Sequence, residues 1–416
     1  MRRKRMGLTM KGKKDLTAVK CARYRKASKD QKQRILDDFL KDTGYNRKYA
    51  IHLLANWGKR KLCVVDGKPV RLVVGKPRER KKRTGKPLYG PAVKTALRKI
   101  WELFDYMCGK RLAVLIRLNL AALANQPDLG IDKQVGQKLL RISPATIDRL
   151  LAPQRKKLQL KGRSHTRAGS LLKNQIPIRV FFDWDERKPG FFELDTVAHD
   201  GGNSTGHYCF TLCVTDVYSG WVELRALPNQ AHRWVKEAAE EVRGQLPFPM
   251  KGVDSDNGGE FINHQLVDWA NDKHIQFTRG RPYRKNDNCF VEQKNGDIVR
   301  RVVGYYRFVS EAEYRALQQV YKHLCPLLNF FYPSMKIISK TRIGSKVKKT
   351  YDPPKPPCQR LLDSPDVQAA SKAKLRMRLH KADIVRQKRL VDQAVARLIR
   401  TYQDRVQGLL PLHGDA

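Results

Sequence analysis

The chain lacks the features that mark zinc proteins, disulfide scaffolds and membrane proteins. Its eight cysteines form no Cys-x-x-Cys pair and have no histidines at metal-binding spacing, which argues against zinc and disulfide frameworks. The longest apolar stretch, 112–124, is interrupted by Arg117 and Asn119 and is too short to cross a bilayer. The basic N-terminus is not followed by an apolar signal segment. We therefore expect a soluble protein of a reducing cytoplasm, with no membrane partner and no small-molecule substrate.

Acidic residues are also scarce, and their distribution is uneven. The chain has 84 Lys and Arg against 40 Asp and Glu, a net charge of +44 and a pI near 10.2. Residues 191–303 nevertheless carry 16 acidic and 13 basic side chains. A large cationic surplus indicates a polyanionic partner such as nucleic acid. An acidic island inside basic flanks is what a metal-using enzyme that acts on DNA requires, whereas a structural nucleoid protein would not need it.

The N-terminal part predicts a DNA-binding helix pair. We expect a basic arm over 1–27, a helix-turn-helix domain over 28–61 and a basic linker over 62–90. Ser28 and Gln31 have the spacing of a capping box, and Gly44 separates two helical patterns. Ala50, Ile51, Leu53 and Leu54 are expected to face inward on the second helix, which leaves its polar residues free to face a major groove.

A second helical, helix-turn-helix-like domain is predicted over 91–160. It comprises helices near 91–107 and 112–124, followed by a helix pair over 133–158. Ser143 and Pro144 have the sequence of a helix N-terminus between the last two. Simple scaffold packing explains this pair as well as DNA reading does.

The pattern changes to strands over 176–308, the predicted catalytic core. Apolar or alternating runs lie at 191–197, 207–215 and 221–227, followed by a helix, a strand near 250–254, a helix, a strand near 275–279 and a long helix over 286–304. This order predicts an α/β fold, with a mixed five-stranded sheet flanked by helices. A basic C-terminal region follows over 309–362, containing a helix pair over 310–331 and an extended segment over 340–352. A long helix is predicted over 363–410, and its stripe of Val391, Val395, Leu398 and Tyr402 packs either on its own chain or on a partner helix.

Three carboxylates in this core have the most informative spacing. Asp195 lies in an apolar strand-like run, Asp256 precedes Asn-Gly-Gly, and Glu292 lies near a helix start, with 35 residues between it and Asp256. Carboxylate oxygens suit Mg²⁺, and two ions held by such a cluster can clamp the attacking and leaving oxygens of a phosphodiester. Asp254 could compete with Asp256 as a ligand, but the Asn-Gly step favours Asp256. Asp200 and Asp216 are interpreted as turn residues.

The stretch 190–308 resembles the retroviral-integrase-like DDE transposases, in particular those of bacterial insertion sequences. The resemblance rests on Glu-Leu-Asp195-Thr, Thr215-Asp-Val-Tyr-Ser-Gly-Trp221, Asp254-Ser-Asp256-Asn-Gly-Gly, and the Phe277-Thr-Arg-Gly-Arg-Pro-Tyr run that leads to Val291-Glu292-Gln. It implies an RNase H-like core in which Asp195, Asp256 and Glu292 are both the catalytic residues and the metal ligands. Two Mg²⁺ ions, with Mn²⁺ as a substitute, would be the cofactor.

The resemblance also implies the partners and the place of action. These are transposon-end DNA and target DNA, bound by a homo-oligomer in the bacterial cytoplasm at the nucleoid. DNA contacts are expected from exposed polar residues of both helix-turn-helix units, from the basic loop before Glu292 and from the helix that carries it: Asn46, Arg47, Lys48, His52, Thr146, Arg149, Arg279, Arg281, Arg284, Lys285, Asn288 and Asn295.

Two other functions share this core. One is a metal-dependent nuclease, which would cut DNA without joining it. The other is a DNA-binding regulator whose core is catalytically silent, against which the intact triad argues.

Overall fold

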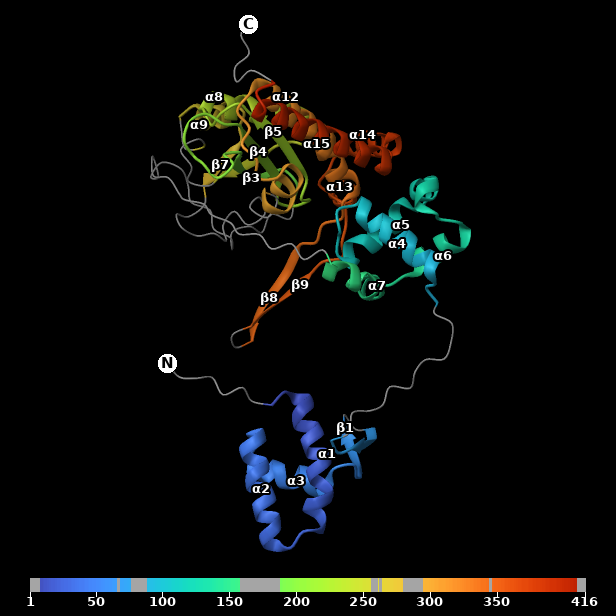
Figure 1. Ribbon diagram of the computed structural model, residues 1–416. Coiled ribbons are helices and arrows are strands. Elements are labelled where there is room, and N and C mark those ends of the chain that lie inside the picture. Colours follow the sequence, from blue (N-terminus) through green and yellow to red (C-terminus); the bar gives the residue numbers. More distant parts are fainter. Residues whose placement is uncertain are drawn as a thin grey trace. The chain divides into compact units, whose positions relative to one another are not determined.

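The computed structural model describes residues 8–65, 68–75, 88–157, 188–255, 261, 264–279, 295–343 and 346–409 (Figure 1). They divide into two compact units, the first ending at Pro87 and the second beginning at Leu88.

The first unit contains three helices and a hairpin. These are α1 (Met10–Lys26), α2 (Lys29–Thr43), α3 (Arg47–Asn56), and the antiparallel strands β1 (Arg60–Val65) and β2 (Lys68–Val73). Ser28 and Gln31 form the predicted capping box, which supplies hydrogen bonds to otherwise unpaired N–H groups at the start of α2. Gly44 ends α2 with a left-handed φ of 64°, a conformation that glycine adopts without steric cost.

Three sequence-based expectations for this unit need correction. The predicted basic arm over 1–27 is largely helix α1, because Cys21 and Tyr24 pack into a shared core with the apolar residues of α2 and α3. The predicted linker over 62–90 contains most of the β1–β2 hairpin. Ile51 is 39% exposed rather than inward-facing.

The second unit begins with four helices. They are α4 (Pro91–Leu103), α5 (Gly109–Ala124), α6 (Lys133–Arg141) and α7 (Pro144–Lys157). Their apolar faces share one core in which Leu97, Leu112 and Ile147 are fully buried. Helices α5 and α7 touch closely at Gly109, where an added Cβ would lie 2.3 Å from the Pro144 carbonyl oxygen.

A mixed five-stranded sheet forms the centre of this unit, as predicted. Its strands are β3 (Phe191–Ala198), β4 (Phe210–Asp216), β5 (Val222–Leu227), β6 (Gly252–Ser255) and β7 (Gln276–Arg279). They lie in the order β5-β4-β3-β6-β7. β3 is antiparallel to β4, which is antiparallel to β5, whereas β3, β6 and β7 run parallel. Strand β3 is therefore central, and β5 and β7 are the edges.

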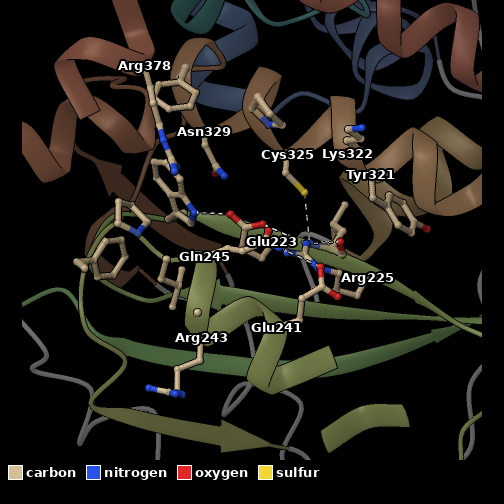
Figure 2. Close-up of a pocket in the computed structure, with 18 of the residues that line it drawn as sticks. Glu223, Arg225, Glu241, Arg243, Gln245, Tyr321, Lys322, Cys325, Asn329 and Arg378 are labelled. Carbon is tan, nitrogen blue, oxygen red and sulfur yellow. Dashed lines mark hydrogen bonds and ion pairs between the residues drawn. The ribbon is translucent and has the colours of Figure 1, made fainter. Parts of the chain in front are cut away.

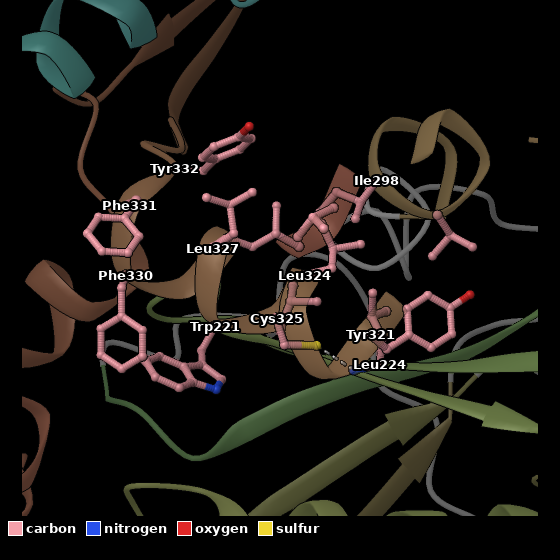
Figure 3. Packing of buried hydrophobic residues seen from close by; sticks show 14 of the residues in the cluster. Trp221, Leu224, Ile298, Tyr321, Leu324, Cys325, Leu327, Phe330, Phe331 and Tyr332 are labelled. Atoms are coloured by element: carbon pink, nitrogen blue, oxygen red, sulfur yellow. Dashed lines mark hydrogen bonds between the residues drawn. The ribbon is translucent and has the colours of Figure 1, made fainter. Parts of the chain in front are cut away.

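Helices α8 (His232–Gln245) and α9 (His264–Asp272) pack on the sheet and on each other, while α12 (Glu311–Pro326) packs against β5 and α15 (Ile384–Val406). Figure 3 shows the apolar contact between α12, its π-helical continuation η4 (Leu327–Phe331) and the sheet. Trp221 at the start of β5 meets the Phe330 ring edge-on at 5.6 Å between centroids. Such contacts bury large apolar areas and hold the sheet in place.

The same helix also supplies polar partners to edge strand β5. The Asn329 side chain accepts from Val222 N and donates to Val222 O, both at 2.8 Å. Leu224 N donates to Cys325 Sγ, and Ala226 N donates to Gln318 Oε1 at 2.8 Å. Backbone groups that an edge strand would leave unpaired are thus bound by side chains from a helix.

The C-terminal region differs from the expectation in three places. The basic segment over 340–352 belongs to an antiparallel hairpin of β8 (Ile337–Ile343) and β9 (Lys346–Tyr351). The helix pair over 310–331 is one run of α12 and η4. The long helix over 363–410 is divided into α14 (Ala369–Lys381) and α15, after a short α13 (Pro357–Asp363), because Ala382 is extended and Asp383 caps a new helix by accepting from Arg386 N.

The stripe on α15 packs on its own chain. Val391 and Leu398 are buried, and Val395 and Tyr402 pack against the same core. Of the predicted helix over 286–304, the structure describes η3 (Asn295–Arg300), which is π-helical, and α11 (Arg301–Val303); its earlier residues lie outside the described part. No helix among the described residues is long and apolar enough to span a membrane.

Candidate functional site

Asp195 lies on the central strand of the sheet. Phe192 and Leu194 lie on the opposite face of β3 from Asp195, because successive side chains of a strand point to opposite faces, and both are fully buried. The Asp195 carboxylate is half-buried and accepts from the Thr196 backbone N–H at 2.8 Å. The fold therefore holds this carboxylate on a rigid element while leaving it accessible.

The strand register defines what lies beside Asp195. Leu194 pairs with Ser255, the last residue of the parallel strand β6. The next residue after Leu194 is Asp195, and the next after Ser255 is Asp256. Asp256 and Glu292 themselves lie outside the described residues, so the geometry of the predicted triad is not tested.

Asp254, the competing carboxylate, has a different environment. It is 1% exposed in β6, in register with Glu193 on β3 and Thr278 on β7. The Thr278 hydroxyl donates to its carboxylate. A buried carboxylate with a hydroxyl donor on the neighbouring strand is a structural group of the sheet interior, which favours Asp256 over Asp254 as a ligand.

A buried polar chain lies beyond the end of β3, four residues from Asp195. His199 Nε2 is 2.7 Å from Thr211 Oγ1, which in turn contacts the Tyr321 hydroxyl of α12. Burial, assisted by the Arg300 cation, lowers the pKa of His199 to about 3, so this imidazole is neutral at physiological pH. Burial also raises the pKa of the Tyr321 hydroxyl. The sequence pattern did not reveal this hydrogen-bonded group of side chains, because its members are far apart in sequence.

The two predicted turn carboxylates have structural roles. Asp216 is fully buried and accepts from Gly190 N at 2.9 Å and Ser219 N at 2.7 Å. Burial raises its pKa. Asp200 accepts from Gly202 N at 3.1 Å. Both carboxylates close turns at strand ends, as predicted.

The carboxylate of Asp195 within β3, with the aspartate that follows β6 in sequence, is the kind of donor set that fits a hard divalent cation. No group of three His, Cys, Asp or Glu side chains in the described part of the chain could hold a metal ion, and two members of the predicted triad lie outside that part. The described member, Asp195, supplies carboxylate oxygen, and the sequence places a second carboxylate directly after β6. Oxygen donors of this kind suit Mg²⁺ or Mn²⁺ rather than soft metals.

The predicted DNA contacts of the first unit lie on the exposed side of α3. Asn46, Arg47, Lys48 and His52 are all exposed. Asn46 also caps α3 by accepting from Lys48 N at 3.0 Å, and Arg47 pairs with Asp37 at 2.9 Å. Both members of that pair are about half exposed, and such surface pairs contribute little stability. Arg47 also donates to Gln33 Oε1 at 2.7 Å.

The two residues predicted in the second helix pair are placed differently. Thr146 is half-buried in the first turn of α7, where its N–H donates to Ser143 Oγ at 3.2 Å. Arg149 is exposed and donates to Thr146 Oγ1 at 3.2 Å. Thr146 is thus part of a helix cap, and Arg149 is the more accessible of the two.

The predicted contacts around the active-site loop fall mostly outside the described residues. Arg279 ends β7, where it pairs with Ser255 of β6, and Asn295 begins η3. The remaining predicted contacts are not described: Arg281, Arg284, Lys285 and Asn288.

A polar cavity of about 850 Å³ lies beside edge strand β5, between α8, α12 and α14 (Figure 2). Arg225 forms ion pairs inside it with Glu223 at 3.2 Å and Glu241 at 3.0 Å. Burial raises the pKa of Glu223 even though Arg225 opposes the shift. Asp195 does not line this cavity, so it is separate from the predicted catalytic carboxylates.

Comparisons with known proteins agree with this architecture. The integrase core domain family matches residues 185–285. The uncharacterized protein y4rM of Sinorhizobium fredii (strain NBRC 101917 / NGR234) is 39% identical over 355 residues, which covers 85% of this chain and 96% of that protein.

Solved structures of retroviral integrase cores are also similar to parts of the chain. The catalytic core of BIV integrase has 16% identity and a TM-score of 0.25, covering 37% of this chain and 88% of its own. The HTLV-2 integrase catalytic core in complex with magnesium has 16% identity and a TM-score of 0.27, covering 35% of this chain and 90% of its own. The chain therefore belongs to the same family as y4rM, and its residues 185–285 form an integrase core domain, the core of polynucleotidyl transferases of the DDE transposase and integrase type.

Proposed function

We propose that this protein is a transposase that binds the ends of an insertion sequence, cleaves DNA there and joins the freed strand to a target. The observation that carries the proposal is the parallel register of β3 and β6. It ends at Leu194 and Ser255, and in sequence each is followed directly by an aspartate of the proposed triad, Asp195 and Asp256.

Asp195, Asp256 and Glu292 are the proposed ligands and catalytic residues. Divalent ions bound by them would activate the attacking oxygen and stabilise the leaving oxygen of a phosphodiester. The protein's own contribution is positional. Strand β3 fixes Asp195 between buried neighbours, and the Thr196 N–H orients one carboxylate oxygen. Such preorganisation reduces the reorganisation needed during reaction.

The exposed polar face of α3 is the proposed end-binding surface, and the helix-turn-helix pattern of α2 and α3 supports it. Its residues Asn46, Arg47, Lys48 and His52 lie on one short helix and its cap. In this proposal the protein works as an oligomer on DNA in the bacterial cytoplasm.

The proposal is tested with Asp195→Asn, Asp256→Asn and Glu292→Gln in the full chain. Each should reduce Mg²⁺-dependent cleavage and joining of end-sequence DNA by more than about a hundredfold, since a metal ligand is lost. DNA binding should be retained. Asp268→Asn is the matched control, because Asp268 is an exposed carboxylate on α9 of the same domain.

Three outcomes would count against the proposal. Full activity of Asp195→Asn would show that Asp195 is not a catalytic metal ligand. Cleavage without joining by the wild-type protein would indicate a nuclease. End binding without metal-dependent chemistry would indicate a silent regulator.

A further inference from the structure

We propose that the β8–β9 hairpin is a second DNA-binding element, a ribbon that lies along a groove of duplex DNA. Residues 337–351 contain five Lys or Arg and no Asp or Glu. A segment with so one-sided a charge has a polyanion as its natural partner. The inference rests on the proposed function, because the partner is the DNA on which the core acts.

The register pairs one lysine with another across the ribbon, Lys340 on β8 with Lys349 on β9. Like charges directly opposite each other destabilise an isolated antiparallel pair. A bound phosphate backbone would remove that repulsion by neutralising both positions.

The ribbon is accessible to such a partner. Lys348, Lys349 and Thr350 are exposed, and Ile338 is 65% exposed. Figure 1 shows the two strands running outward from the sheet domain rather than lying on it. A two-stranded ribbon fits a major groove about 12 Å wide, and strands of six or seven residues extend about 20 Å along it.

The base of the ribbon is fixed to the catalytic domain. Asp352 accepts from Lys336 N at 2.6 Å and pairs with Arg360 of α13 at 2.5 Å. The Lys336 ammonium donates to the Tyr218 carbonyl in the turn between β4 and β5. Burial, with Arg360 nearby, lowers the pKa of Lys336 to about 8.

The helical part of the second unit also reaches this base, since Arg111 of α5 donates to the Pro333 carbonyl at 2.5 Å. The ribbon is therefore held from both the sheet and the helices, and its direction relative to β3 is set by these contacts. A basic element fixed in this way would orient bound DNA relative to Asp195.

The test measures how binding of the full-length protein to a duplex of about 30 base pairs depends on salt, without divalent metal, from about 50 to about 200 mM KCl. The variant is Lys348→Gln with Lys349→Gln. The plot of log K against log salt has a negative slope, and each lost phosphate contact makes it less steep by about 0.9. The double variant should therefore reduce the steepness by about 2. Lys348→Arg with Lys349→Arg keeps both charges and should keep the wild-type slope.

Lys374→Gln with Arg376→Gln is the matched control, because it removes two exposed charges from α14. An unchanged slope in the ribbon variant, or an equal change in this control, would overturn the inference. Because binding is measured without metal, this result is independent of whether Asp195→Asn abolishes cleavage. The experiments can therefore reject DNA binding by the ribbon without rejecting the catalytic proposal, and the reverse.

Discussion

Acid should destabilise this protein through His199, a side chain that the catalytic proposal does not use. His199 is fully buried directly after β3, and its Nε2 lies 2.7 Å from Thr211 Oγ1. Burial, with help from the Arg300 cation, lowers its pKa from 6.5 to about 3 in the folded protein. In the unfolded chain the same imidazole takes up a proton below about pH 6.5.

The sign and size of the effect follow from that difference. A group whose pKa is lower in the folded protein than in the unfolded chain stabilises the fold at pH values above its unfolded pKa. For His199 this contribution is lost as the pH falls from about 6.5 toward 3. At about pH 5 the unfolded chain has gained about 2 kcal/mol from protonation, while the folded protein has gained almost none.

Urea unfolding followed by tryptophan fluorescence at about pH 7.5 and about pH 5 measures this loss. The wild-type protein should lose about 2 kcal/mol more than His199→Gln between the two conditions, since glutamine does not titrate. His207→Gln, which removes an exposed histidine of the same domain, should behave as wild type. Equal acid sensitivity of wild type and His199→Gln would refute the reasoning.

Two further substitutions test the packing of the second unit by thermal and urea unfolding. Arg405→Ala should destabilise it by about 3 kcal/mol, because Glu313 is fully buried and loses a cation that lies 2.8 Å away; no loss would mean that this pair does not hold α15 on α12. Gly109→Ala should cost about 1–3 kcal/mol through its 2.3 Å approach to Pro144 O. At Gly136 inside α6 an added Cβ would lie no closer than 3.6 Å to a neighbour, so Gly136→Ala should stabilise the protein by up to about 1 kcal/mol. An equal loss in both glycine variants would contradict the steric argument.

The sheet could be predicted from the sequence because each strand carries its own signal. The run Phe210–Asp216 is buried at every position, and turn residues separate it from its neighbours. The integrase-like core and its five-stranded sheet were thereby predicted and are confirmed. The residues chosen as catalytic stay a prediction, since Asp256 and Glu292 lie outside the described residues.

The errors arise where structure depends on contacts between distant residues. The sequence predicts an arm in place of helix α1 because the charges there outnumber the few apolar residues that pack on α2 and α3. It predicts one extended segment in place of the β8–β9 hairpin because neither strand alone shows which strand it pairs with. No glycine or proline marks the break between α14 and α15 in the sequence. The N-cap residue Asp383 predicts a helix start less strongly than a glycine or proline predicts a helix end.

The side chains bound along β5 limit how copies of this protein can assemble. Asn329, Cys325 and Gln318 engage the outward backbone groups of Val222, Leu224 and Ala226, so a neighbouring molecule cannot extend the sheet there. In the proposed oligomer on DNA, subunits would therefore meet at surfaces other than this edge of the sheet. Covering this edge also lowers the tendency of the protein to form fibrils by strand pairing at β5.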